Sequence, residues 1–146
     1  MKALIVEKSS TMRSILLRML SMRGFEVVEA ENVSSAWSML QDLGKADLVL
    51  VNWSPSERDS LEFISRLRQE ASNVTKVIIL EPYKTGVREL HHAIVAGADD
   101  YLITPFTSLQ MDEKLSLTGL ICHRGDYCDW RGVPYQEQLH PGVADD

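Results

Sequence analysis

Short apolar runs alternate with amphipathic segments along this 146-residue chain as far as Leu117. Four of the runs are continuous and short, which is typical of strands buried on both faces of a parallel sheet. The run over residues 25–29 alternates between apolar and polar positions instead, as in a strand with one covered face. We therefore predict five strands, at residues 3–6, 25–29, 47–51, 77–80 and 101–103.

Each predicted strand is followed by apolar residues at the three- and four-residue spacing of a helix. Ser9 or Ser10 can cap the first helix, and Asn32 can cap the second. Asp59 with Glu62 resembles a capping box that would open the third helix. Glycines that can end a helix follow the first, second and fourth of these segments, at Gly24, Gly44 and Gly97.

A weaker fifth helix is expected over Ser108–Leu117. Strands that alternate with helices five times predict an α/β fold, a doubly wound sheet of five parallel strands with right-handed crossovers. From Gly119 onward the periodic pattern ends, and Gly, Pro, His and charged residues dominate. We therefore expect one domain over residues 1–118 and an irregular C-terminal tail over residues 119–146.

The most informative stretch is the central strand, where Leu48–Val51 lead into Asn52 and Ser54-Pro55 break the run. In open parallel sheets, functional groups lie just beyond the carboxyl ends of the strands. Asn52 should therefore face the functional crevice, together with Glu7 and Lys8, which follow the first strand.

Composition and charge narrow the function further. The net charge is −6 and no basic cluster occurs, which argues against nucleic acid as a partner. The apolar start is too short for a signal peptide, and no run reaches membrane-spanning length. The two cysteines, Cys122 and Cys128, do not make a disulfide framework. A cytoplasmic location, away from membranes, is the expectation.

Five stretches resemble the receiver domain of bacterial response regulators, in particular the single-domain chemotaxis type. The similarity covers roughly residues 1–117. It rests on Leu4–Val6 followed by Ser9–Arg13, and on Gly24–Val27, Asp47–Val51, Ala96–Leu102 and Pro105–Phe106. The resemblance implies a flavodoxin-like strand order 2-1-3-4-5, a cis peptide bond before Pro105 and a role in two-component (phosphorelay) signal transduction.

The positions that carry the chemistry of that family differ here. Where the family has an acidic pair after the first strand, this chain has Glu7-Lys8. Where the family has its phosphate-accepting aspartate after the third strand, this chain has Asn52. Where the family has a hydroxyl residue at the end of the fourth strand, this chain has Glu81. Where it has a lysine before the proline that follows the fifth strand, this chain has Thr104. All five positions depart from the family's residues, and Glu7 alone keeps the residue class found there in the family.

These substitutions remove what phosphoryl transfer needs. The amide of Asn52 is not a nucleophile, and Glu7 is one carboxylate where Mg²⁺ requires several oxygen ligands. Lys8 places a cation beside the expected metal position, and we expect it to bridge Glu7 and Glu81 instead. The alternative is that all three charges are solvated at the rim of the sheet. The sequence therefore predicts no magnesium, no cofactor and no enzymatic activity.

The function predicted on this basis is that of a degenerate receiver, or pseudo-receiver, that binds a protein of a two-component or chemotaxis-like pathway without phosphate. The family's output surface comprises the fourth helix, fifth strand and fifth helix. Here it would lie around Arg88, His92, Tyr101 and Lys114. Tyr101 matches the family's aromatic switch residue, although it could simply pack on the fourth helix.

Two other functions stay open. A receiver could be switched by unconventional phosphorylation, for instance on a serine near the crevice. Ser9-Ser10-Thr11 at a helix N-terminus could instead bind a phosphate ligand, as in other flavodoxin-like proteins, although the loop has no glycine. A zinc site is disfavoured, because no usual motif matches the spacing of Cys122, His123, Cys128 and His140.

Overall fold

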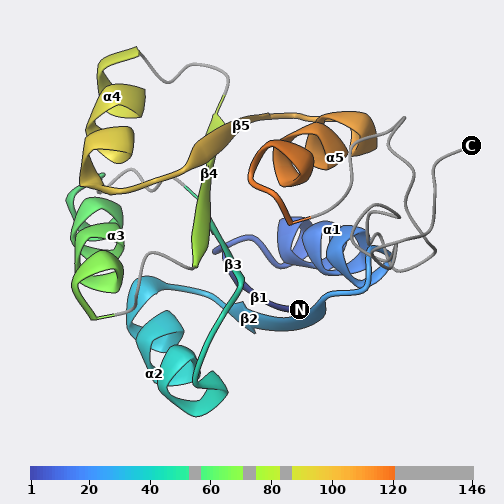
Figure 1. Ribbon diagram of the computed structural model, residues 1–146, viewed down its shortest axis with the longest axis horizontal. Helices are drawn as coiled ribbons and strands as arrows, with labels where there is room; N and C mark the ends of the chain where they lie inside the picture. The colour runs from blue at the N-terminus through green and yellow to red at the C-terminus, as the bar shows by residue number, and fades with distance from the viewer. Residues whose placement is uncertain (53–56, 71–74, 83–86, 121–146) are drawn as a thin grey trace, which may run out of the picture.

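The computed structural model describes residues 1–52, 57–70, 75–82 and 87–120. Strands and helices alternate five times along this part of the chain, as the apolar pattern predicts (Figure 1). The elements are β1 (Lys2–Val6), α1 (Ser10–Ser21), β2 (Glu26–Ala30), α2 (Val33–Leu43), β3 (Leu48–Asn52), α3 (Glu57–Glu70), β4 (Lys76–Pro82), α4 (Val87–Ala96), β5 (Asp100–Thr104) and α5 (Ser108–Leu117).

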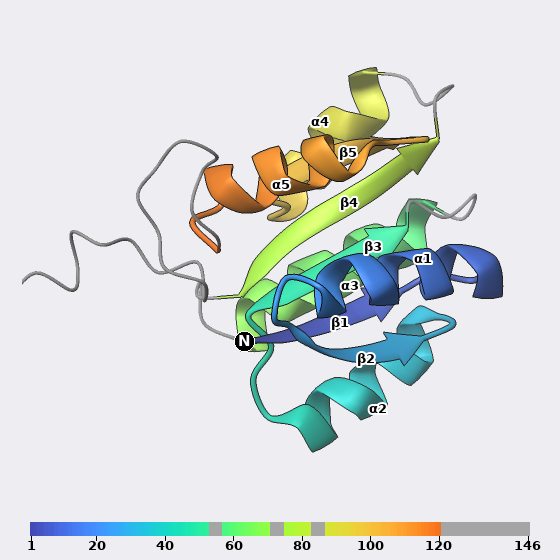
Figure 2. The same ribbon diagram turned by 90° about the vertical axis from the view of Figure 1, so that its right-hand side faces the viewer.

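All strand pairs in the sheet are parallel, and their order is β2-β1-β3-β4-β5. This order confirms the 2-1-3-4-5 expectation. Val6 pairs with Val51, and Asn52 pairs with Leu80, so β1, β3 and β4 reach the same edge of the sheet in register. Figure 2 shows these strands running in one direction, with their carboxyl ends together.

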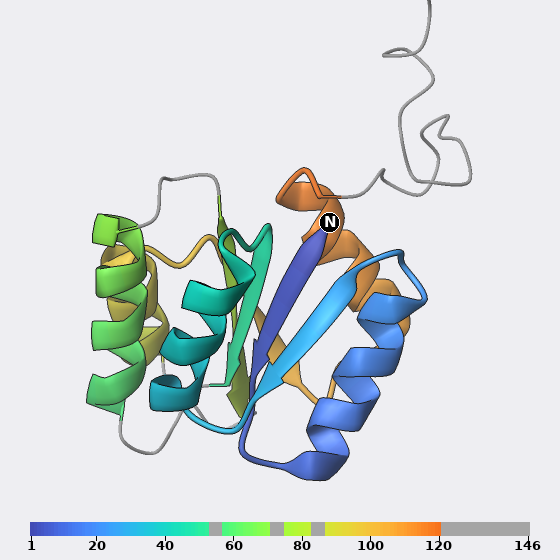
Figure 3. The ribbon, with the colours of Figure 1, turned by 90° about the horizontal axis from the view of Figure 1, so that it is seen from below.

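Two helical layers cover the sheet. Helices α1 and α5 lie on one face and α2, α3 and α4 on the other (Figure 3). Because side chains alternate along a strand, Leu48 and Leu50 pack in the α1–α5 core, whereas Val49 and Val51 pack in the core under α2–α4. Burial on both faces explains why β3 reads as a continuous apolar run.

Helix starts follow local chemistry. The side chains of Ser9 and Asn32 cap α1 and α2 by accepting backbone N–H groups, as predicted. Thr107 and Gln110 form a complete capping box at α5, which the sequence analysis missed. This box helps a helix whose apolar stripe is interrupted.

The predicted start of α3 is wrong. The helix begins at Glu57, so Asp59 lies in its first turn and not at the cap. Phe63 was also missed as a core residue, although it is 1% exposed. It lies beside the predicted inward stripe and widens the apolar face that α3 turns to the sheet.

Strand ends differ from the predicted ranges by one or two residues. The largest difference is in β4, which continues through Pro82 because the ladder to β5 extends to the Pro82–Thr104 pair. Within the described ranges, no helix is long and apolar enough to cross a bilayer. The cysteines and nearly all of the 119–146 tail lie outside the described residues, so the two-part organisation stays a prediction.

Candidate functional site

The candidate site lies where β1, β3 and β4 end. Asn52 is the last residue of β3 and is half-buried. Glu7 and Lys8 directly follow β1, and Glu81 comes one position after the partner of Asn52 on β4. The parallel register therefore brings the predicted residues to one edge of the sheet, at the switch point between β1 and β3.

The buried Glu7 side chain forms a hydrogen bond with the loop that follows it. The residue is 4% exposed, and its Oε1 accepts a hydrogen bond from the backbone N–H of Ser9 at 2.9 Å. Its own N–H donates to the carbonyl of Ala30 at 2.9 Å. The carboxylate thus stabilises the turn from β1 into α1.

Arg13, which the sequence analysis did not single out, holds the same loop from α1. Its Nη1 donates to the carbonyl oxygens of Glu7 at 2.8 Å and Lys8 at 3.1 Å. The guanidinium also lies 3.9 Å from Glu29 and 3.7 Å from Glu31. A fixed cation therefore lies behind the loop where the resemblance places the family's acidic pair.

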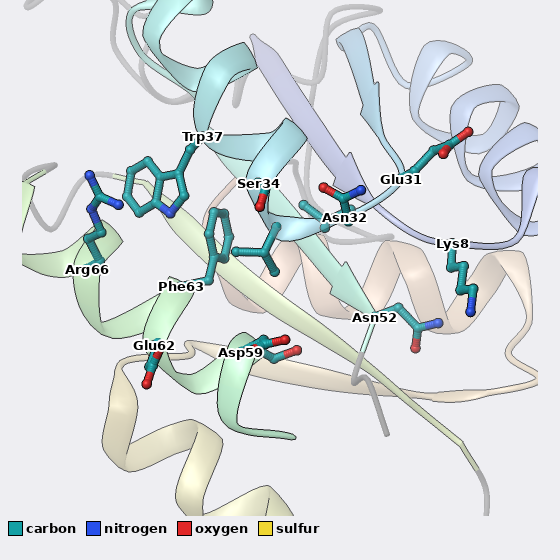
Figure 4. Close-up of a pocket in the computed structure, with 13 residues that line it drawn as sticks. Lys8, Glu31, Asn32, Ser34, Trp37, Asn52, Asp59, Glu62, Phe63 and Arg66 are labelled. Atoms are coloured by element: carbon teal, nitrogen blue, oxygen red, sulfur yellow. The ribbon is translucent and has the colours of Figure 1, made fainter. Parts of the chain in front are cut away.

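The predicted bridge from Lys8 to two acids is not formed. Throughout the described part of the chain, no ion pair joins Lys8 to Glu7 or to Glu81. The reason is geometric: Glu7 is buried and occupied by the Ser9 amide, while Lys8 is exposed. Figure 4 shows the Lys8 side chain beside Asn52 at one end of a pocket.

This pocket has a volume of about 570 Å³ and lies between α2 and α3. Trp37, Phe63 and Arg66 gather at the end away from Lys8 (Figure 4). The Trp37 and Phe63 rings meet edge to face, with centroids 5.3 Å apart. The lining residues are Val6, Lys8, Glu31, Asn32, Val33, Ser34, Trp37, Asn52, Asp59, Ser60, Glu62, Phe63 and Arg66.

On the other side of the crevice, Glu81 is 1% exposed. Its carbonyl accepts a hydrogen bond from the Thr104 hydroxyl at 3.1 Å, which ties β5 to β4. The Thr104–Pro105 peptide bond is cis, as expected. Among the described residues, no group of three or more His, Cys, Asp or Glu side chains is placed to hold a metal ion.

Tyr101 on β5 is half-buried and packs against the core under α2–α4. Lys114 of α5 covers it, with Nζ 4.5 Å from the ring centroid. The same Nζ donates to Asp100 Oδ1 at 2.9 Å. The tyrosine ring is thus enclosed between the core and a cation held by a neighbouring carboxylate.

Exposed apolar residues lie on the elements around this tyrosine, at the open edge of the sheet. Figure 1 shows β5 between α4 and α5. Among the described side chains of these elements, the large exposed apolar residues are Ile94, Val95, Ile103, Leu109 and Leu117. His91 and His92 are both exposed on α4, whereas the Arg88 side chain lies outside the described part.

The sequence model of the family named response regulator receiver domain matches residues 3–116 of this chain. The chain belongs to that family. This receiver is 33% identical over 118 residues to chemotaxis protein CheY1 of Helicobacter pylori, covering 80% of this chain and 95% of that protein. It is 34% identical over 116 residues to a CheY homolog of Campylobacter jejuni, covering 79% and 89%.

Solved structures agree with the fold of this receiver. A Thermotoga maritima response regulator superposes with a TM-score of 0.71 at 28% identity, over 80% of this chain and 95% of that chain. Vibrio cholerae chemotaxis protein CheY4 gives a TM-score of 0.71 at 21% identity, over 80% of this chain and 97% of that chain.

Some of the residues discussed from the sequence lie outside the part of the chain that the structure describes. They are Ser54 and the candidate zinc ligands Cys122, His123, Cys128 and His140.

Proposed function

We propose that this receiver is degenerate: it acts in two-component or chemotaxis-like signalling by binding a protein partner without first accepting phosphate. One observation carries the proposal. Asn52 occupies the end of β3 in the crevice, and its amide nitrogen, whose lone pair is delocalised, forms no acyl phosphate.

The surroundings of Asn52 support the loss of magnesium as well. Mg²⁺ binds through carboxylate and other oxygen ligands in near-octahedral order. Glu7 is buried and engaged by the Ser9 amide, and Lys8 projects an ammonium group beside Asn52. A divalent ion in this crevice would meet a cation where a second carboxylate is needed.

Incubation with acetyl phosphate and Mg²⁺, followed by intact mass spectrometry, tests the proposal. We expect the mass of the wild-type protein to stay unchanged, because no nucleophilic carboxylate ends β3. A mass gain of one phosphoryl group would contradict the proposal. If that gain survives acid but not phosphatase treatment, it would support phosphorylation of a hydroxyl group instead.

We further propose that the partner binds the α4–β5–α5 surface, where Ile94, Val95, Ile103 and Leu109 are exposed. Replacing Ile103 by glutamate should weaken partner binding at least about tenfold, because a charge would replace an apolar contact at its centre. Pull-down from an extract of the source organism, with bound proteins identified by mass spectrometry and affinities then measured on purified partner, checks this expectation.

The matched control is Met22→Glu, which places the same charge on an exposed apolar residue at the end of α1. Binding should be unchanged in this variant. Equal losses in both variants would contradict the assignment of the surface. The same assay on a chain that ends at Leu120 asks whether residues 121–146 contribute to binding.

A further inference from the structure

The pocket between α2 and α3 combines two kinds of lining. Trp37 and Phe63 form an aromatic wall, to which Val6 and Val33 add apolar surface. Lys8 and Asn52 provide an ammonium group and an amide at the opposite end (Figure 4). A volume of about 570 Å³ lies within the range of small-molecule sites.

Among the described residues of the pocket lining, Lys8 and Arg66 are cations and Glu31, Asp59 and Glu62 are carboxylates. Glu31 lies 3.7 Å from Arg13, and Glu62 lies 3.2 Å from Arg58. Both of these arginines are outside the pocket lining. These carboxylates therefore carry cationic partners of their own.

Arg66 is engaged in the same way. It pairs with Glu70 at 3.1 Å and lies over the Trp37 ring at 4.3 Å. Lys8, in contrast, has no ion pair within the described ranges. Within the described part of the chain, Lys8 thus presents an ammonium group without an ion pair at the end of β1, where a ligand's anionic group can meet it.

Ser60 supplies a second, independent observation. It lies on α3, is 1% exposed and contributes to the pocket lining. Its Oγ has no hydrogen-bond partner among the described residues. Such a buried hydroxyl is costly to the folded protein unless something completes its hydrogen bonding. A polar ligand atom in the pocket would do so.

We propose that this pocket binds a small organic anion with a flat ring. The ring packs against Trp37 and Phe63, the anionic group pairs with Lys8, and a polar atom reaches Ser60. Phosphate and carboxylate groups share this chemistry. The inference concerns α2 and α3 and is independent of the partner surface around β5.

The test is titration of the ¹⁵N-labelled full-length protein with phenyl phosphate and with phenylacetate, followed by NMR. We expect saturable shifts of the Trp37 indole and of the Lys8 and Ser60 amides with at least one probe. Comparing the affinities of phenyl phosphate and phenylacetate then identifies the preferred anion. The neutral counterparts phenol and phenylacetamide should bind at least about tenfold more weakly. Absence of saturable shifts, or equal binding of the neutral compounds, would overturn the proposal.

Three variants make the test site-specific. Lys8→Ala should weaken probe binding about tenfold, whereas Lys45→Ala, which removes an exposed lysine before β3, should leave it unchanged. Ser60→Ala should weaken binding severalfold and yet raise the melting temperature by about 2–5 °C, since it removes a buried unsatisfied hydroxyl. Equal effects of the two lysine variants, or a Ser60→Ala protein that binds normally, would overturn the assignment.

Discussion

The double replacement Lys8→Asp with Asn52→Asp should give a protein that acquires one phosphoryl group from acetyl phosphate in the presence of Mg²⁺. The new carboxylate at the end of β3 supplies the missing nucleophile. The new carboxylate at position 8 adds an oxygen ligand next to Glu7 and removes the cation. Intact mass spectrometry over a time course measures the rate.

Single replacements separate these two contributions. Asn52→Asp alone should be phosphorylated at least about tenfold more slowly than the double variant, because Lys8 opposes the metal. A divalent ion about 4 Å from an ammonium group is repelled by up to about 8 kcal/mol at an effective dielectric constant near 20, and the exposed Lys8 reduces this by turning away. Lys8→Asp alone should not be phosphorylated.

The matched control pairs Asn52→Asp with Lys45→Asp, which has the same net charge but places the second carboxylate before β3. It should behave like Asn52→Asp alone. If the double variant at positions 8 and 52 binds Mg²⁺ and stays unphosphorylated, the explanation based on these two side chains is wrong. The buried Glu81 would then be the next residue to change.

Replacing Arg68 by alanine should lower the free energy of unfolding by about 2–4 kcal/mol. Arg68 lies near the end of α3 and joins this helix to Thr75, just before β4, and to the loop between α4 and β5 that contains Gly97 and Asp99. Its Nε donates to the carbonyl of Gly97 at 2.9 Å, and its other nitrogens donate to the Thr75 carbonyl and to Asp99. Without the guanidinium, two carbonyls and the Asp99 carboxylate lose a charged donor. Urea unfolding with an unchanged m-value is the measurement.

Arg58→Ala is the control on the same helix. Arg58 pairs with Glu62 at 3.2 Å, but its side chain is 88% exposed, so the change should stay within about 0.5 kcal/mol. Arg68→Lys should fall between the two, since it keeps the charge and loses the planar fork. A loss for Arg68→Ala no larger than that for Arg58→Ala would contradict this role.

The close packing around Arg68 also explains one glycine. Gly97 has φ +124°, which side-chain-bearing residues rarely adopt, and a Cβ there would lie 2.6 Å from Arg68 Cγ. The sequence analysis assigned this glycine only to the end of α4. The close approach of Gly97 to α3 depends on the packing of α4 against α3, which the sequence pattern does not specify.

Much of the fold could be predicted because its signals are local. Apolar runs and helical periodicity located all ten elements, and Ser9 and Asn32 marked two helix starts. Asp59 failed as a marker because the first turn of α3 and its cap favour the same residue types. Strand order came from the family resemblance, since periodicity does not say which strands pair.

For the candidate site, the sequence by itself determined which chemical groups end the strands: an amide at Asn52, and a carboxylate and an ammonium at Glu7 and Lys8. The parallel sheet then requires these groups to share one edge. Their interactions depended on tertiary structure. The burial of Glu7, the side-chain direction of Lys8 and the pocket beside Ser60 arise from contacts between segments far apart in the chain, which no local pattern encodes.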